Sequence, residues 1–221
     1  MIITIDELCE RLGIPQTISE DQFKGQHVPY DLQAKWYDRN SLPSTKAVAP
    51  IVSERLQGVE TAVELGHGTG FRVLYYALNN PQTQFLAIDK ERKATDLLKE
   101  RVKKLNVGNL RVQTGEMYEL KGQYAATLAI DCFFYPSESD AITQWATSCL
   151  RLSRLVDRTK NPAFFAVPFY DALGSRYEMS EAYVLRIFQE AKLRLDATSS
   201  SFEFNQCNGE HWTGRMLFGR P

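Results

Sequence analysis

The sequence predicts an α/β fold with an open, mostly parallel sheet, and three observations support this. From about residue 51 onward, short apolar runs typical of buried strands alternate with amphipathic helical stretches. The first of these runs leads into a glycine-rich turn, in which Gly66, Gly68 and Gly70 occupy alternate positions. Two later runs end at carboxylates, Asp89 and Asp131. Because ligands of open α/β sheets bind at the carboxyl ends of the strands, these groups are expected to border one cleft.

Length and composition set the broad class of the protein. The 221 residues are enough for one sizeable domain and a modest extension, and the formal net charge of -1 predicts no general attraction to nucleic acid or to an acidic membrane. The four cysteines, Cys9, Cys132, Cys149 and Cys207, are scattered without metal-ligand spacing. No basic-then-apolar leader and no apolar run of about 20 residues is present. A soluble cytoplasmic protein with reduced thiols, not associated with membranes, is expected.

Residues 1–50 are expected to form a helical extension or lid ahead of a core domain over residues 51–221. Apolar spacing predicts helices, and proline and glycine predict where they end. The expected elements are a helix over Ile5–Leu12 ended by Gly13–Pro15, a helix with an aromatic face over Tyr30–Arg39, a turn-rich connection over Asn40–Pro50 and a helix over Ile51–Leu56.

The core is expected to contain five strand–helix units followed by a hairpin. The first strand includes Ala62, Val63 and Leu65, and the later ones are Thr83–Ile88, Leu110–Thr114, Tyr124–Ile130 and Ala163–Val167. The helices are Val73–Leu78, Lys90–Asn106, Glu138–Leu155 and Met179–Leu193. Arg194–Asn205 and Trp212–Phe218 alternate in polarity, which predicts two antiparallel strands joined around Cys207–Glu210.

The stretch TAVELGHGTGFRVLYYA, at Thr61–Ala77, indicates which ligand the turn suits. The first helical amides of Phe71–Leu74 have no intrahelical partners and favour an anionic group. The dinucleotide pattern requires a third glycine where this chain has Phe71, and Glu64 would repel a pyrophosphate. S-adenosylmethionine instead carries a sulfonium and an ammonium, which suit Glu64, and a carboxylate, which suits the amides. A tight turn without a ligand is the alternative.

The same residues resemble the E/D-x-G-x-G-x-G signature of the class I S-adenosylmethionine-dependent methyltransferases. The resemblance implies a Rossmann-like fold, with a mostly parallel seven-stranded sheet, a C-terminal antiparallel hairpin and an N-terminal helical extension. It also implies S-adenosyl-L-methionine as cofactor and S-adenosyl-L-homocysteine as product. In element order it covers about residues 51–221, although only the glycine motif is specific at the level of sequence.

The resemblance assigns cofactor roles to residues at the ends of successive strands. Asp89 is placed to accept both ribose hydroxyls, Glu116 to lie near the adenine amino group and Met117 to cover the ring. An exposed turn acid and a core methionine are the alternative for the last two. The expected cofactor-binding residues are Glu64, Gly66, His67, Gly68, Gly70, Asp89, Lys90, Glu116, Met117 and Asp131.

The acceptor is expected beyond the fourth strand, at Asp131–Tyr135. Nucleobase amino methyltransferases carry D/N-P-P-Y/F here, whereas this chain has Cys132 and Phe133 in place of both prolines, which argues against that chemistry. An A-x-x-Y-D segment, Ala34–Asp38, resembles one that closes over the cofactor in small-molecule enzymes, and a helix that only packs on the domain is equally compatible. The expected acceptor-binding residues are Tyr30, Trp36, Tyr37, Cys132, Phe133, Tyr135 and Phe169.

Methyl transfer from a sulfonium is an in-line displacement that depends mainly on alignment and exclusion of water. A general base is needed only where the nucleophile is protonated, and His211 and Tyr135 are the weak candidates for that role. The backbone amide of His67 is assigned to the cofactor, with participation of its side chain as the lesser alternative. Asp131 has no clear carboxylate companion, so no metal is expected.

The sequence therefore predicts a methyltransferase that acts on an O, N or C nucleophile of a small molecule. Three alternatives remain open. The first is an RNA or protein methyltransferase that uses the basic stretches Lys99–Lys104 and Arg151–Lys160. The second is a nicotinamide-dependent oxidoreductase, against which Glu64 and Phe71 argue. The third is a catalytically silent protein that binds S-adenosylmethionine.

Overall fold

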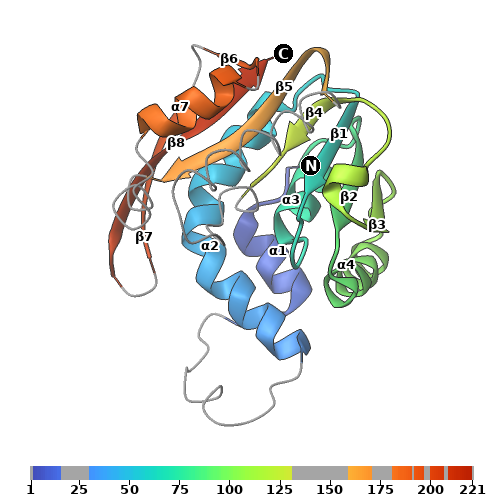
Figure 1. Cartoon of the computed structure of the whole chain (residues 1–221). Coiled ribbons are helices and arrows are strands. Elements are labelled where there is room, and N and C mark those ends of the chain that lie inside the picture. The colour runs from blue at the N-terminus through green and yellow to red at the C-terminus, as the bar shows by residue number, and fades with distance from the viewer. Residues whose placement is uncertain are drawn as a thin grey trace.

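The structure is a computed structural model that describes residues 2–15, 30–130, 159–170, 181–190, 192–196, 200–206 and 209–220 (Figure 1). Its helices are α1 (Ile5–Leu12), α2 (Tyr30–Arg55), α3 (Phe71–Asn79), α4 (Arg92–Leu105), the short 3-10 helix η2 (Met117–Glu119) and α7 (Glu181–Glu190). Its strands are β1 (Thr61–Leu65), β2 (Gln84–Asp89), β3 (Leu110–Thr114), β4 (Tyr124–Leu128), β5 (Thr159–Tyr170), β6 (Arg194–Leu195), β7 (Ser200–Asn205) and β8 (His211–Arg220). The expected helix over Glu138–Leu155 lies outside the described residues.

The described strands form one sheet in the order β3-β2-β1-β4-β5-β8-β6, with β7 also paired to β8. The pairs from β3 to β5 are parallel, and β8 is antiparallel to β5. This confirms the α/β, Rossmann-like fold with a C-terminal antiparallel hairpin. The described sheet has eight strands instead of the expected seven, because the predicted strand over Arg194–Asn205 is divided into β6 and β7, which both pair with β8.

Helix α1 occupies the predicted residues, and its ends follow from local side-chain chemistry. The Thr4 hydroxyl accepts from the amide of Glu7 at 3.1 Å, and the Glu7 carboxylate accepts from the amide of Thr4 at 2.7 Å, which is a capping box. Gly13 ends the helix in the left-handed conformation, with φ 69°. The buried face of α1 includes Leu8 and belongs to the main hydrophobic core.

Helix α2 corrects the sequence analysis, because Tyr30–Arg55 is one helix of 26 residues that contains both Pro43 and Pro50. The predicted turn-rich connection over Asn40–Pro50 is therefore wrong, and residue 50, the expected end of the extension, falls inside a helix. A proline inside a helix costs about 3 kcal/mol because it removes a hydrogen bond and crowds the preceding turn. Here the helix buries an apolar face that offsets this cost, formed by Leu42, Val48, Ala49 and Val52.

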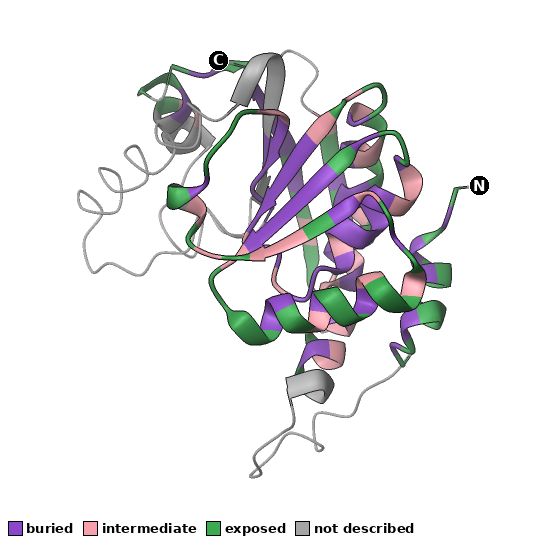
Figure 2. Cartoon of the chain, turned by 90° about the vertical axis from the view of Figure 1, so that its right-hand side faces the viewer, coloured by how far each residue is buried: buried purple, intermediate pink, exposed green. Residues whose placement is uncertain are grey.

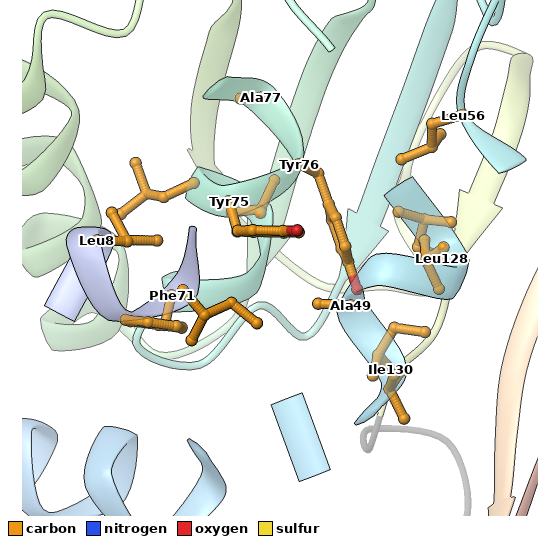
Figure 3. Close-up of a cluster of buried hydrophobic side chains, with 14 of the residues drawn as sticks. Leu8, Ala49, Leu56, Phe71, Tyr75, Tyr76, Ala77, Leu128 and Ile130 are labelled. Carbon is orange, nitrogen blue, oxygen red and sulfur yellow. The ribbon is translucent and has the colours of Figure 1, made fainter. Parts of the chain in front are cut away.

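The core lies where α1, α2 and α3 meet the central strands. Figure 2 shows those strands as buried, with exposed outer faces on the neighbouring helices. Phe71 and Tyr75 of α3 lie beside Leu8, whereas Tyr76 points toward Ala49 of α2 (Figure 3). This packing fixes α3, and with it the glycine turn that leads into it, between the sheet and the N-terminal helices. Within the described ranges, no helix is long and apolar enough to cross a membrane.

Candidate active site

The turn between β1 and α3 has the backbone geometry that its glycines predict. Gly66, Gly68 and Gly70 all have positive φ, at 64°, 55° and 75°, where side chains with a Cβ are strained. The amide of Gly66 donates to the Ile88 carbonyl at 2.8 Å, which ties the start of the turn to β2. A Cβ at Gly70 would lie 2.4 Å from Leu98 Cδ1, so the third glycine allows close packing against α4.

Asp89, at the end of β2, joins the second strand to this turn. One carboxylate oxygen accepts from the amide of Gly68 at 2.8 Å, and the other accepts from the amide of Glu91 at 2.9 Å. The parallel register sets Leu65 beside Ile88, so the carboxyl ends of β1 and β2 lie next to each other. The structure thus brings Asp89 and Gly68, two of the predicted cofactor residues, into direct contact.

A pocket lies at this point, between the glycine turn and α2. Glu64, Gly66, His67 and Gly68, all predicted cofactor residues, line it together with Tyr37, a predicted acceptor residue. The carboxylate-bearing Glu64 is 3% exposed, whereas Tyr37 is 47% exposed. The remaining lining residues are Ser41, Thr45, Thr69, Phe71, Arg72 and Ile130.

His67 is the most unusual side chain in this pocket. Its Nδ1 lies 2.9 Å from the Gly68 carbonyl, and because a carbonyl only accepts, Nδ1 carries the proton. Nε2 is then an acceptor, and it is buried without a hydrogen-bond partner in the described part of the chain. Burial lowers the pKa of His67, although the nearby Asp89 carboxylate opposes this. His67 is therefore a neutral acceptor beside the glycine turn.

Sequence reasoning identified Tyr37 but missed the other polar residues that α2 and α3 contribute to the pocket, Ser41, Thr45 and Arg72. Arg72 donates from Nε to the Thr45 hydroxyl and from Nη2 to the Ser44 hydroxyl, each at 3.2 Å. Tyr37, Ser41 and Thr45 are four residues apart and share one helical face, a spacing that was readable in the sequence. Pro43, which lies within these residues, favours a turn in the sequence and so hides this shared face.

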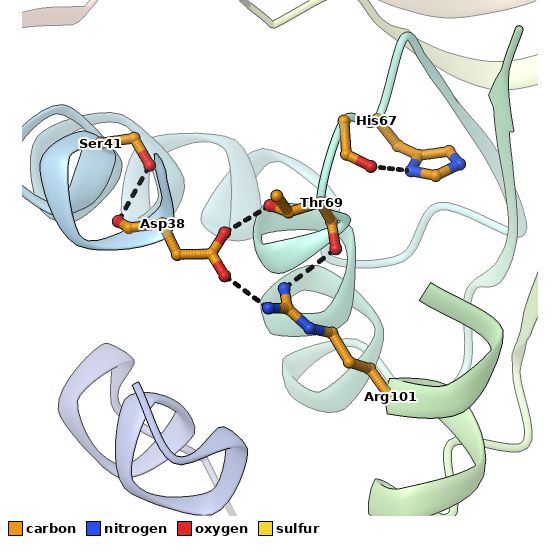
Figure 4. A network of polar contacts seen from close by, with 6 residues as sticks. Asp38, Ser41, His67, Thr69 and Arg101 are labelled. Carbon is orange, nitrogen blue, oxygen red and sulfur yellow. Dashed lines mark hydrogen bonds and ion pairs between the residues drawn. The ribbon is translucent and has the colours of Figure 1, made fainter. Parts of the chain in front are cut away.

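A second group of missed residues lies behind the turn (Figure 4). The Asp38 carboxylate of α2 accepts from the Thr69 hydroxyl and, at 2.6 Å, from Nη2 of Arg101 on α4. Nη1 of Arg101 donates to the Thr69 carbonyl at 3.0 Å. Burial raises the pKa of the Asp38 carboxyl, and the Arg101 guanidinium opposes the rise by charge and hydrogen bonding. Asp38, Thr69 and Arg101 are called the turn network below.

Several predicted site residues do not line the pocket described here. Lys90 and Glu116 are exposed, and Trp36 and Met117 are partly buried, Met117 in η2. His211 is exposed on β8, where Nδ1 lies 3.0 Å from Asn205 Oδ1 and Nε2 lies 3.8 Å from a Glu203 carboxylate oxygen. The remaining predictions fall outside the described residues or their described side chains: Tyr30, Asp131, Cys132, Phe133, Tyr135 and Phe169.

Across the described residues, no three His, Cys, Asp or Glu side chains are grouped as a metal ion would require. The pocket chemistry described above therefore consists of one buried carboxylate, a neutral imidazole, the Arg72 guanidinium, hydroxyls and backbone amides. Such a set suits a ligand that carries both positive and negative groups.

Comparison with solved structures shows the fold of a class I S-adenosylmethionine-dependent methyltransferase. An S-adenosylmethionine-dependent methyltransferase from Aquifex aeolicus is 18% identical with a TM-score of 0.61, over 87% of this chain and 99% of that one. Magnesium protoporphyrin IX methyltransferase from Synechocystis, with bound S-adenosylmethionine, is 15% identical with a TM-score of 0.62, over 91% and 89%. An enzyme from Pyrococcus horikoshii described as a putative RNA methyltransferase is 13% identical with a TM-score of 0.59, over 100% and 97%.

A family model adds evidence at the level of sequence. The model described as "putative methyltransferase" matches residues 59–134, which include β1, the glycine turn, Asp89 and η2. Comparison with curated protein sequences finds no match. This match over part of the chain and the fold both show that the chain is similar to the class I S-adenosylmethionine-dependent methyltransferases. One of these similar proteins, the Synechocystis enzyme, has been solved with bound S-adenosylmethionine and with bound S-adenosylhomocysteine.

Proposed function

We propose that this enzyme transfers the methyl group of S-adenosylmethionine to an O, N or C nucleophile of a small-molecule acceptor by in-line displacement. The observation that carries the proposal is the contact between Asp89 and the amide of Gly68, beside a pocket lined by Glu64 and His67. It joins a hydroxyl-binding carboxylate to an anion-binding turn at the carboxyl edge of the sheet, where ligands of this fold class bind.

The residues present fit the cofactor. When bound, it supplies a methyl group already activated on a sulfonium. Asp89 is assigned to its ribose hydroxyls, the turn amides to its carboxylate, and Glu64 to its positive charges. Lys90, Glu116, Met117 and Asp131 keep the roles that the family resemblance implies, as proposals.

His67 provides an independent test of this fit. A buried acceptor without a partner costs roughly 1–3 kcal/mol, so Nε2 favours a ligand with an N–H or O–H donor. The cofactor offers such donors at its ammonium and at its ribose hydroxyls. We therefore assign the His67 side chain, as well as its amide, to cofactor binding.

The charge distribution supports a small acceptor over RNA. Part of the positive charge of α4 is compensated, because Arg92 and Lys99 both pair with Asp96, at 3.7 and 3.5 Å, and Arg101 is buried against Asp38. Such mixed faces are typical of solvated helices and give little attraction to phosphates. The acceptor itself is expected to be held by Tyr37, Trp36 and the other predicted acceptor residues, with His211 and Tyr135 as candidate bases.

Thermal unfolding with S-adenosylhomocysteine, S-adenosylmethionine or NADH tests the cofactor. A ligand at 100 times its dissociation constant adds about 2.7 kcal/mol, which raises the Tm of a chain of this size by roughly 5–10 °C. A rise with the adenosyl ligands and none with NADH is expected. A rise with NADH alone, or with none of the three, contradicts the proposal.

RNA is the second candidate acceptor, because the Pyrococcus enzyme described as a putative RNA methyltransferase aligns over the whole of this chain. Incubation with methyl-labelled S-adenosylmethionine, and either a panel of phenols, amines and carbon acids or total RNA, separates the two. Label in small molecules is expected. Label in RNA, with binding that weakens steeply as salt rises, would reassign the acceptor.

The role proposed for residues 1–50 is to cover the cofactor, and the pocket-lining side chains of α2 support it. Deleting these residues is expected to weaken S-adenosylhomocysteine binding, as measured by calorimetry on the folded fraction. An unchanged affinity would refute the cover role and leave the cofactor assignment intact.

A further inference from the structure

The turn network connects three segments that are far apart in sequence, and each connection is direct. Asp38 and Arg101 are 63 residues apart, and Asp38 and Thr69 are 31 apart. Exposure is 0% for Asp38, 6% for Arg101 and 7% for Thr69. The three groups are therefore withdrawn from water and depend on one another for their hydrogen bonds.

This network holds both the hydroxyl and the carbonyl of Thr69. Its hydroxyl donates to Asp38, and its carbonyl accepts from Arg101 at 3.0 Å. Holding the side chain and the carbonyl together fixes the orientation of the peptide that joins Thr69 to Gly70. That peptide lies between Gly68, whose amide meets Asp89, and Phe71, the first residue of α3. The network thus acts on the part of the turn assigned to the cofactor.

The same helix that provides Asp38 also lines the pocket. Tyr37, Ser41 and Thr45 of α2 line it beside the turn, and Arg72 of α3, which also lines it, donates hydrogen bonds to Thr45 and Ser44. Figure 4 shows the Asp38 carboxylate directed toward Thr69 and Arg101, the Ser41 hydroxyl directed toward the Asp38 carbonyl, and the His67 ring pointing away from them. The network therefore lies behind the turn, and His67 points in another direction.

We propose that Asp38 is a positioning residue that, through Thr69 and Arg101, couples the docking of α2 to the shape of the glycine turn, so that cofactor affinity depends on this buried contact. The inference rests on the proposed function, because it assigns the turn to the cofactor. Asp38 does not touch the cofactor in this account; it sets the geometry of groups that do.

Three variants test the coupling. Asp38→Asn keeps the shape but removes the charge that meets Arg101, and is expected to raise the Kd for S-adenosylhomocysteine at least tenfold in calorimetry. Thr69→Val, which keeps the branched shape without the hydroxyl, should weaken binding in the same direction. Thr69→Ser, which keeps the hydroxyl, should restore Kd to within about threefold of wild type. Thr69→Ser loses a methyl group but keeps the hydroxyl, so its contrast with Thr69→Val isolates the hydroxyl.

Asp196→Asn is the matched control. Asp196 forms a separate arginine–carboxylate cluster, with Arg55 and Arg220, and lies outside the pocket lining. It is expected to change Kd by less than twofold. A folded Asp38→Asn variant with the affinity of wild type would overturn the inference.

Two further measurements keep the test decisive. If Asp38→Asn fails to fold, the double variant Asp38→Leu with Arg101→Met is used instead. It removes both buried charges together, a replacement that protein cores tolerate. Unchanged affinity of this double variant for S-adenosylhomocysteine overturns the inference. Where wild type binds no S-adenosylhomocysteine, the proposed function fails, and hydrogen exchange then decides the coupling separately. Asp38→Asn should speed exchange of the amides of residues 66–74 at least tenfold more than Asp196→Asn does, and equal rates would refute the coupling.

Discussion

Helix α2 is held at two places by the same chemistry in different surroundings. In the turn network, Asp38 meets Arg101 with side chains that are 0% and 7% exposed. At the other end of the helix, Arg55 meets Asp196, which is also 3.0 Å from Nη2 of Arg220 on β8, and these three side chains are 27%, 13% and 52% exposed. Arg55 also lies 5.3 Å from the centre of the Phe218 ring.

The difference between the two clusters shows how burial and redundancy decide what an ion pair does. Asp196 has two arginines and access to water, so loss of one partner leaves its charge compensated. In the turn network, Asp38 has one guanidinium and one hydroxyl, both buried, so loss of a partner leaves a charge in the interior. We therefore expect the partly exposed Asp196 cluster to tolerate change, and the buried turn network to hold the geometry of the turn.

The largest expected effect comes from breaking each cluster by the same substitution. Arg101→Met should lower the free energy of unfolding by about 3–5 kcal/mol, because the Asp38 carboxylate is left buried and unpaired. Arg55→Met should cost less than about 2 kcal/mol, because Asp196 keeps Arg220. Urea unfolding of both variants measures the difference. Equal losses would mean that burial does not distinguish the two clusters.

A smaller effect is expected from the glycine next to Thr69. Gly70→Ala places a side chain on a residue with positive φ and sets its Cβ 2.4 Å from Leu98 Cδ1. Together the backbone strain and the close contact should lower the free energy of unfolding by roughly 2–4 kcal/mol. Gly68→Ala is the matched control, because it has positive φ but no heavy atom within 4 Å of the added Cβ. It should cost only about 1–2 kcal/mol of strain. If both variants lose the same stability in urea, the close approach of the turn to α4 contributes nothing.

These contrasts also show which features the sequence alone could predict. Strand β3 and helix α1 occupy their predicted residues because strand periodicity, capping and a terminal glycine are local signals. The middle of helix α2, over Asn40–Pro50, was missed because Pro43 and Pro50 are strong local breakers, whereas the burial of Val48 and Val52 that overrides them is a tertiary effect.

The candidate site divides in the same way. Glu64, Gly68 and Asp89 could be predicted as site residues, because strand ends and glycine spacing determine where they meet. Arg101 could not be predicted, because a basic residue on a charged helix indicates a solvated face. Its burial depends on Asp38, 63 residues earlier in the chain. A pairing over that distance leaves no periodic signal.

The smallest expected effect is a pH dependence that arises on the pocket side of the turn, at His67. Burial lowers the pKa of His67 below the value of about 6.5 that it has in the unfolded chain, so the unfolded chain takes up the proton first as pH falls. Stability contributed by the neutral ring is then complete above about pH 6.5 and is lost as pH falls toward the lowered pKa, by at most about 1.4 kcal/mol per pH unit.

His67→Asn isolates the contribution of the His67 ring to this pH dependence. The asparagine side-chain amide still offers a donor for the Gly68 carbonyl but does not titrate. Urea unfolding of both proteins between pH 7.5 and 5 should show wild type losing stability relative to the variant below about pH 6.5. Parallel curves for the two proteins would contradict a buried neutral imidazole. Opposite curvature, with wild type gaining stability as pH falls, would mean that attraction to the Asp89 carboxylate outweighs burial and that the ring is charged beside the turn.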